Sequence, residues 1–292
     1  MYNPFYNGVI EDDDTALVRE ALAGSRPSLE KLVRLHQPWI YNIACRMVAD
    51  LDEAEDITQE ILIKLITRLS TFDPEKSSLR TWLYRVAVNH VISLAKTRHE
   101  EPLSALAGDG DYFEAIGKIV DDRRASAPEQ RVLDSEAKAA CLTGMLLCLD
   151  RRSRIAFILG EIFGANDALG AEIMEMERAN FRKVLSRARE RVYNFLGQKC
   201  GLVDANNPCR CSRSVRTQIK LGFIDPGRLI TARGSITVSE ALGGRVEKIE
   251  REYSRSLRSL YRDGPFLEPP DLAGWMKSVL DSAEFRDVFN LQ

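Results

Sequence analysis

The stretch that decides the fold is residues 50–96, DLDEAEDITQEILIKLITRLSTFDPEKSSLRTWLYRVAVNHVISLAK. Apolar residues recur in it at helical spacing in two blocks, which predicts two amphipathic helices joined by a short polar loop. The apolar positions are Ala54, Ile57, Ile61, Leu65 and Leu69 in the first block and Leu79, Leu83, Ala87, Val91 and Leu94 in the second. We expect both helices to bury these sides in the core.

The opposite side of the first helix is acidic and polar. It carries Asp52, Asp56, Gln59, Glu60 and Thr67, and residues 50–60 contain six acidic side chains and no basic one. Acidic side chains near a helix start interact favourably with the helix dipole. Taken alone, the pattern therefore favours simple stabilisation of the helix start.

The opposite side of the second helix carries Trp82, Arg85, Asn89, Ser93 and Lys96. An aromatic side chain interleaved with cations and an amide suits stacking on bases together with phosphate and base-edge contacts. Aromatic side chains are usually buried, so the alternative is that Trp82 is an ordinary core residue and Arg85 a solvated charge.

The motifs DxxxAEDxxQExxxK, FDP and LRTWLYRVAxNH within this stretch resemble the helical core of bacterial RNA polymerase sigma factors, in particular the extracytoplasmic-function (ECF) group. The resemblance implies that the acidic helix binds the polymerase largest subunit and that the second helix melts and reads the −10 promoter element. The implied polymerase contacts are Asp52, Asp56, Gln59 and Glu60. The implied promoter contacts are Phe72 and Ser78 in a base-capturing loop, and Arg80, Trp82, Arg85, Asn89 and Lys96.

Composition describes a globular protein. The chain has 292 residues, enough for two compact domains and a tail, with 45% hydrophobic and 29% charged residues. It has no apolar run approaching 18 residues and no secretion signal at the amino terminus, so we expect a cytoplasmic protein without a membrane span. The net charge of −2 does not exclude nucleic acid, because residues 178–199 carry seven Lys or Arg and one acid.

Taken in order, the chain predicts an all-α fold with four parts. Residues 11–99 form the first helical domain, in which Gly24–Pro27 breaks the opening helix and residues 38–49 pack on the acidic helix. Trp39 and Cys45 are expected in the core, and His36 is equally well a helix-end residue. Residues 100–128 are a flexible linker, residues 129–197 a second helical domain, and residues 198–292 a mainly helical carboxy-terminal extension.

Residues 164–192, GANDALGAEIMEMERANFRKVLSRARERV, predict helix, turn and basic helix. Arg178, Arg182, Lys183, Arg187, Arg189 and Arg191 are too many cations for one buried surface. They suit a recognition helix in the DNA major groove, or simply a solvated basic helix.

This segment resembles the sigma-factor domain that reads the −35 element. The resemblance implies base contacts from Asn180, Arg182, Lys183, Ser186 and Arg187 and phosphate contacts from Arg178 and Arg189. Two positions depart from the family pattern: Gly170 replaces a large apolar residue, and Glu175 stands where the turn usually has glycine. We therefore expect a distorted turn.

The extension begins with Cys200, Cys209 and Cys211 beside Arg210 and Arg213. Cations lower thiol pKa values, which suits metal binding or redox sensing. A structural zinc site needs four ligands and no further Cys or His follows, so a metal, a redox role and a purely structural loop all remain open.

Further along the extension, Ser235–Val238 is β-prone, Ser239 is expected to cap a helix with Leu242, Val246, Ile249 and Tyr253 on its apolar side, and residues from Leu272 through Phe285, Val288 and Phe289 predict a final helix or helix pair.

These observations predict a sigma factor without catalytic chemistry, whose partners are core RNA polymerase and double-stranded and melted promoter DNA. The extension would regulate it from within, and a separate anti-sigma factor is an open alternative. The competing hypothesis is a helix-turn-helix transcriptional regulator that does not replace the polymerase sigma subunit. No nucleophile–base pair or phosphate-cradling loop indicates an enzyme, and no cofactor is certain.

Overall fold

The structure is a computed structural model that describes residues 3–5, 11–95, 99–100, 130–231, 234–242 and 257–281. Several predicted features therefore lie outside the described residues. These are Lys96, the linker after Glu100, the apolar positions Val246, Ile249 and Tyr253, and the final positions Phe285, Val288 and Phe289.

The amino-terminal part consists of α1 (Glu11–Leu22), α2 (Arg26–Val48), α3 (Leu51–Arg68), a 3₁₀ turn η1 (Leu69–Thr71) and α4 (Leu79–Ser93). The break before Pro27 is confirmed: Ser25 caps α2 and accepts a hydrogen bond from the Ser28 backbone. The expected continuation of the helix over residues 38–49 is confirmed, because α2 runs unbroken through Pro38 and packs on α3. Residues on both sides of Pro38 are buried in one core, which holds the helix together across the missing N–H group.

The α3–α4 hairpin forms as predicted. Asp50 caps α3, accepting hydrogen bonds from the backbones of Asp52 and Glu53, and Ser78 caps α4. All predicted apolar positions of the two helices are buried except Leu94, which is half-buried. Trp39 and Cys45 are core residues as expected. His36 is not a helix-end residue, since it is fully buried inside α2, where burial lowers its pKa to about 3.

The second helical part consists of α7 (Gln130–Leu147), α8 (Arg151–Phe157), a π-helical turn η2 (Ile158–Ile162), α9 (Asp167–Ile173) and α10 (Arg178–Lys199). Asp150 caps α8 and Asn166 caps α9. Helices α9 and α10 are the predicted helix and basic helix, joined by the turn at residues 174–177.

The extension contains α11 (Cys211–Lys220), β1 (Gly234–Thr237), α12 (Val238–Ala241), α14 (Leu257–Arg262), β2 (Pro265–Leu267) and α15 (Leu272–Asp281). Strands β1 and β2 pair antiparallel, so the β-prone segment at 235–238 does form a strand. The expected cap at Ser239 is wrong: Thr237 caps α12 in a reciprocal capping box with Glu240. The fold class is all-α, with this small sheet as an addition.

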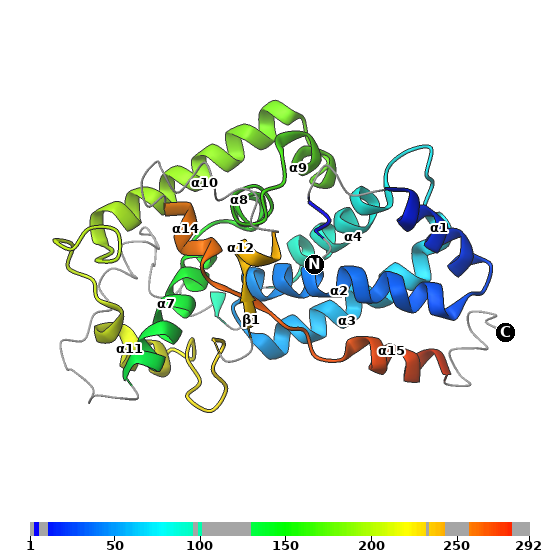
Figure 1. Cartoon of the computed structure of the whole chain (residues 1–292). Coiled ribbons are helices and arrows are strands. Elements are labelled where there is room, and N and C mark those ends of the chain that lie inside the picture. Colours follow the sequence, from blue (N-terminus) through cyan, green and yellow to red (C-terminus); the bar gives the residue numbers. More distant parts are fainter. Residues whose placement is uncertain are drawn as a thin grey trace.

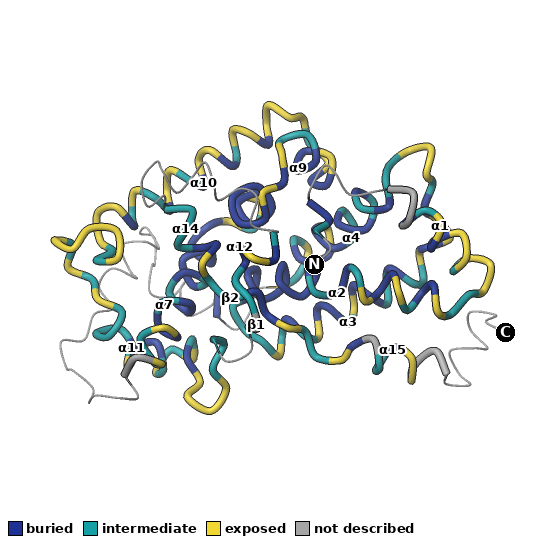
Figure 2. Tube along the Cα trace, viewed as in Figure 1, coloured by how far each residue is buried: buried dark blue, intermediate teal, exposed yellow. Residues whose placement is uncertain are grey.

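The extension lies against both helical parts (Figure 1). Strand β2 and α15 run along α2, whereas α11 packs on α7 and α14 on η2. Buried backbone concentrates in α2, α7 and α8, where these parts meet (Figure 2). The larger of two hydrophobic clusters among the described residues runs from α1 to α15, so the two helical parts and the extension close on each other, and a smaller cluster joins α7 to the extension around α11. Within the described residues, no helix is long and apolar enough to cross a membrane.

Candidate polymerase and nucleic-acid surfaces

The first candidate site is the acidic surface, defined as Asp52, Asp56, Gln59 and Glu60 on α3. The buried side of α3 holds the helix against α2 and α4, which leaves these side chains exposed, with Gln59 half-buried. Glu60 lies 3.2 Å from His90 Nε2. Burial and the charge of Lys64 lower the pKa of His90, and Glu60 opposes them. The structure thus presents the four predicted residues together on one helix.

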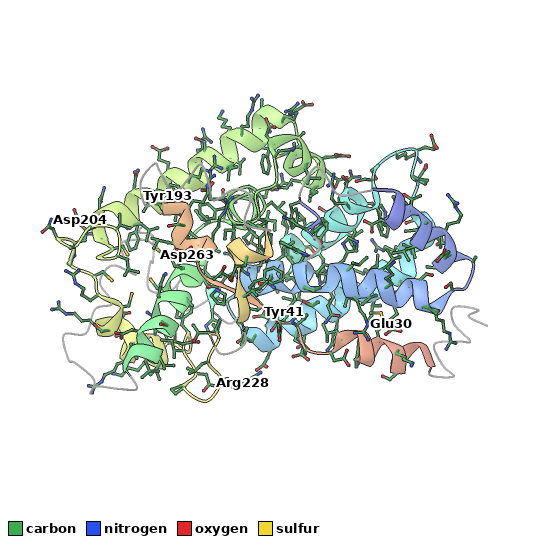
Figure 3. All side chains as sticks on the ribbon, viewed as in Figure 1. Glu30, Tyr41, Tyr193, Asp204, Arg228 and Asp263 are labelled. Atoms are coloured by element: carbon green, nitrogen blue, oxygen red, sulfur yellow. The ribbon has the colours of Figure 1, made fainter. Side chains whose placement is uncertain are left out.

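Asp52 is engaged by another part of the chain, although its side chain remains 66% exposed. Arg228, from the extension (labelled in Figure 3), donates to both of its carboxylate oxygens, with both distances 2.7 Å. The loop that carries Arg228 is itself held on α7, because the buried Glu136 carboxylate accepts bonds from the backbones of Ile230 (2.5 Å) and Thr231 (2.9 Å).

The second candidate site is the α4 surface, defined as Trp82, Arg85 and Asn89. Trp82 is half-buried and packs on Phe72, with ring centroids 5.9 Å apart. Arg85 is half-buried and Asn89 is exposed. Of the other predicted promoter contacts, Phe72 is buried and Ser78 bonds the Thr81 backbone, so both also have structural roles. Arg80 is half-buried beside them.

The helix-turn-helix covers part of the α4 surface. Asn89 Nδ2 donates to Glu175 Oε2 at 3.1 Å, and Arg85 Nε lies 3.6 Å from Glu175 Oε1. Arg85 also donates to the backbone oxygen of Glu172 at 3.4 Å. Two predicted promoter contacts are therefore engaged by the chain's own α9 and the turn after it.

The third candidate site is the basic face of α10. The opposite face of the helix is buried through Phe181, Leu185, Ala188, Val192 and Leu196. This orientation leaves exposed the predicted contacts Arg178, Asn180, Arg182, Lys183, Ser186 and Arg187. Arg178 bonds Asp167 at 2.8 Å, and Arg182 lies 3.6 Å from the same carboxylate. The hydrogen bond from Arg178 lowers the pKa of Asp167.

Arg189 differs from the other cations of α10. It pairs with Glu161, which is 1% exposed, and Glu161 also accepts bonds from Tyr193 and from Arg258 of the extension, both at 2.5 Å. Burial raises the pKa of Glu161, but the bonds from Arg258 and Tyr193 and the two positive charges outweigh it and leave the pKa lowered. Glu161 thereby ties the helix-turn-helix to α14.

Both departures from the family pattern have a structural counterpart. A Cβ on Gly170 would overlap the buried ring of Phe181, which fills the space that a larger residue would take. Glu175 adopts φ 51°, the left-handed conformation that glycine favours. The turn therefore keeps a glycine-like backbone rather than the distorted one that the sequence predicts.

The cysteines lie in a group larger than the sequence predicts. The backbones of Cys200 and Cys209 pair in an isolated parallel β-bridge. Cys211, at the start of α11, packs near Ala137 and Ala140 of α7. Cys141 follows on the same helix, and the thiols at 200, 209 and 211 contribute to raising its pKa after burial.

The expectation of lowered thiol pKa values is wrong for two of the three cysteines. Burial, reinforced by neighbouring thiols, raises the pKa of Cys209 and brings that of Cys211 to about 11. Arg210 favours the Cys209 thiolate but is outweighed. Among the described residues, no three metal-binding side chains are arranged to hold an ion. A metal or redox role at Cys200, Cys209 and Cys211 stays a prediction.

Comparison with known proteins places these surfaces in a family context. The sequence model of sigma-70 region 2 matches residues 32–100, which contain the acidic surface and the α4 surface. The chain is 29% identical to the RNA polymerase sigma-H factor of Pseudomonas aeruginosa over 186 residues, 62% of this chain and 93% of that protein. It is 33% identical to the probable ECF RNA polymerase sigma factor SigI of Mycobacterium tuberculosis over 162 residues, 54% of this chain and 52% of that protein.

A solved structure described as CnrH in complex with the cytosolic domain of CnrY is similar at a TM-score of 0.46 and 21% identity, covering 67% of this chain and 100% of that one. The sequence comparisons confirm the predicted resemblance to ECF sigma factors. More than a third of the chain lies outside the alignment with sigma-H.

Sequence reasoning missed Arg228, Glu136 and Glu161. Glu161 is detectable in the sequence, because it is the only charged residue in the apolar run 155–163, IAFILGEIF, and a buried charge needs partners. The local sequence gives no indication of the contacts of Arg228 and Glu136, because their partners are 176 and about 95 positions away in sequence.

Proposed function

We propose that this ECF-type sigma factor binds core RNA polymerase through the acidic surface, melts and reads the −10 element through the α4 surface, and reads the −35 element through the basic face of α10. The single observation that carries the proposal is the α3–α4 hairpin. Its rigid packing places carboxylates on one exposed face and an aromatic, a guanidinium and an amide on another. Carboxylates suit a basic protein surface, and the second set suits unstacked bases and phosphates.

We propose that the protein acts in the cytoplasm by binding polymerase and promoter DNA, and that it catalyses no reaction itself. Capturing unstacked bases on Trp82 would stabilise melted DNA, and phosphate contacts would make binding sensitive to salt. A run-off transcription assay with core polymerase tests this. The full chain is expected to direct initiation from a particular promoter class. Failure to bind core polymerase at low salt contradicts the proposal.

The alternative is a helix-turn-helix regulator that does not bind polymerase as a sigma subunit. The doubly substituted variant Asp56→Asn, Glu60→Gln separates the two, because both side chains are exposed and lie outside the core. In a sigma factor this variant loses polymerase binding. In a plain regulator it binds DNA and acts as the unsubstituted chain does. Glu30→Gln, an exposed substitution on α2, is the matched control.

We further propose that the extension holds the factor closed, in place of or in addition to a separate anti-sigma factor. Three anchors support this. Arg228 covers Asp52, Arg258 binds Glu161, and strand β2 is held on α2, where Asn42 exchanges two hydrogen bonds with the Leu267 backbone. Deleting residues after Leu221 should raise promoter-directed transcription. Unchanged activity and unchanged response to the inducing signal contradict this proposal.

A further inference from the structure

The turn of the helix-turn-helix contains an unfavourable residue. Glu175 has φ 51°, and Ala49 is the only other non-glycine residue with positive φ among those described. Left-handed backbone crowds the Cβ atom of an L-residue, so glycine would be the less strained choice at 175. Backbone hydrogen bonds at the end of α9, from Met176 N–H to the Ala171 oxygen (3.0 Å) and from Glu175 N–H to the Glu172 oxygen (3.4 Å), hold this left-handed turn. The left-handed turn directs the Glu175 side chain away from α9.

The Glu175 side chain crosses from the turn to α4. Its two carboxylate oxygens lie 3.1 Å from Asn89 Nδ2 and 3.6 Å from Arg85 Nε. The backbone oxygen of Glu172 receives a further bond from Arg85. A carboxylate thus faces a guanidinium and an amide, the two kinds of donor that commonly bind phosphate and base edges.

We propose that Glu175 is an autoinhibitory latch: its carboxylate occupies Arg85 and Asn89 in place of DNA and holds the helix-turn-helix closed over the α4 surface. This inference rests on the proposed role of the α4 surface. Opening the latch frees both donors for DNA and removes one polar contact between the two helical parts, which the shared hydrophobic core also holds together. Because the two segments are 86 positions apart in sequence, the latch acts between the two helical parts.

The latch is weak, which suits a switch. Glu175 is 53% exposed and Arg85 30%, so water and salt screen the pair. Exposed pairs of this kind correspond to a shift of about two- to fivefold in an equilibrium. Polymerase or DNA that binds the open state is therefore able to displace it.

The test uses the full chain and a fluorescent pool of random-sequence single-stranded DNA. Glu175→Gln removes the charge and keeps the side-chain shape, and Glu175→Gly also relieves the backbone. Both are expected to bind the pool about two- to fivefold more tightly than the unsubstituted chain at low salt, with the difference shrinking at high salt. Glu172→Gln is the matched control: it removes one negative charge from the same segment, but its recorded contact with Arg85 is through the backbone.

Equal affinity of the Glu175→Gln and Glu172→Gln variants overturns the latch, because the effect would then be one of net charge. The variant Arg85→Ala distinguishes a failure of the latch from a failure of the proposed role of the α4 surface. If it weakens DNA binding while Glu175→Gln changes nothing, the latch fails and the proposed function stands. If Arg85→Ala leaves both DNA binding and promoter-directed transcription unchanged, the role of the α4 surface fails and the latch fails with it. Thermal unfolding of each variant checks that it is folded.

Discussion

Arg228 and Asp52 form a bidentate ion pair between the carboxy-terminal extension and the first turn of α3, with both N–O distances 2.7 Å. The planar guanidinium directs two N–H groups at the two carboxylate oxygens, so the pair fixes the orientation of the two side chains relative to each other. Asp52 belongs to the acidic surface, and the neighbouring acids raise the local negative potential that attracts the cation. The extension therefore engages one of the four residues that we propose for polymerase binding.

Replacing Arg228 by Ala should increase affinity for core polymerase. The pair is exposed at both ends and screened by salt, so the expected gain is a few-fold and should shrink as ionic strength rises. Titration of fluorescent full-length chain with core polymerase measures it. Arg216→Ala, which removes another exposed cation from the extension, is the control. Equal affinity of both variants and the unsubstituted chain would show that the extension does not compete for the acidic surface.

Glu161 should make the closed form sensitive to acid. Its folded pKa lies below the ordinary value of 4.5, so its stabilising effect is fully present above that value and disappears as pH falls through the lower folded pKa. Glu161→Gln should lower the free energy of unfolding by about 1.5–3 kcal/mol at pH 7, the usual range for hydrogen bonds to a charged group. The difference in the free energy of unfolding between this variant and the unsubstituted chain should become smaller below pH 4.5.

Urea unfolding at pH 7 and pH 4 measures both effects. Glu30→Gln is the control, because among the described residues Glu30 (Figure 3) pairs only with Arg34, on the same helix and exposed to solvent, so the substitution should change the unfolding free energy by less than about 0.5 kcal/mol. A Glu161→Gln chain as stable as the unsubstituted one at pH 7 would show that Arg189 and Arg258 find other partners.

The parts of the fold that local sequence determines were predictable. Apolar spacing predicted α3, α4 and α10, because such a pattern depends on neighbours within a few positions. Pro38 shows the limit of local rules. Its sequence signal favours a break, but burial on both sides keeps α2 continuous.

The closed arrangement was not predictable, because it depends on pairs that lie far apart in sequence. Arg228–Asp52, Arg258–Glu161 and Asn89–Glu175 are separated by 176, 97 and 86 positions. The thiols illustrate the same point. Adjacent arginines suggested lowered pKa values, but packing against α7 buries Cys211 and reverses the direction. The sequence marked Glu175 as unusual, and only the fold shows what its carboxylate contacts.

Cys211 should react slowly with alkylating agents. Its pKa is about 11 against an ordinary value of 9.0, so at pH 8 the thiolate fraction is about 100-fold below that of an unperturbed thiol. Burial raises the pKa of Cys141 as well, which should make it similarly slow. Mass spectrometry after iodoacetamide treatment of folded and urea-unfolded protein gives the rate at each cysteine. Cys211 alkylated equally fast in both states would contradict the burial of its thiol by α7.

Gly170 and Gly197 should respond to alanine in opposite directions. In an open helix, Gly→Ala is stabilising by about 0.5–1 kcal/mol because it reduces the entropy of the unfolded chain. Gly197, on α10, has no atom of the described residues within 4 Å of the position that a Cβ would take, and it should follow this rule. A Cβ on Gly170 would lie 2.6 and 2.7 Å from the Cε atoms of Phe181, whose fully buried ring has no free space to enter. Gly170→Ala should therefore destabilise the chain by about 1–3 kcal/mol. Thermal and urea unfolding of the two variants measure the contrast, and a stabilised Gly170→Ala chain would mean that Phe181 does not fill the space beside α9.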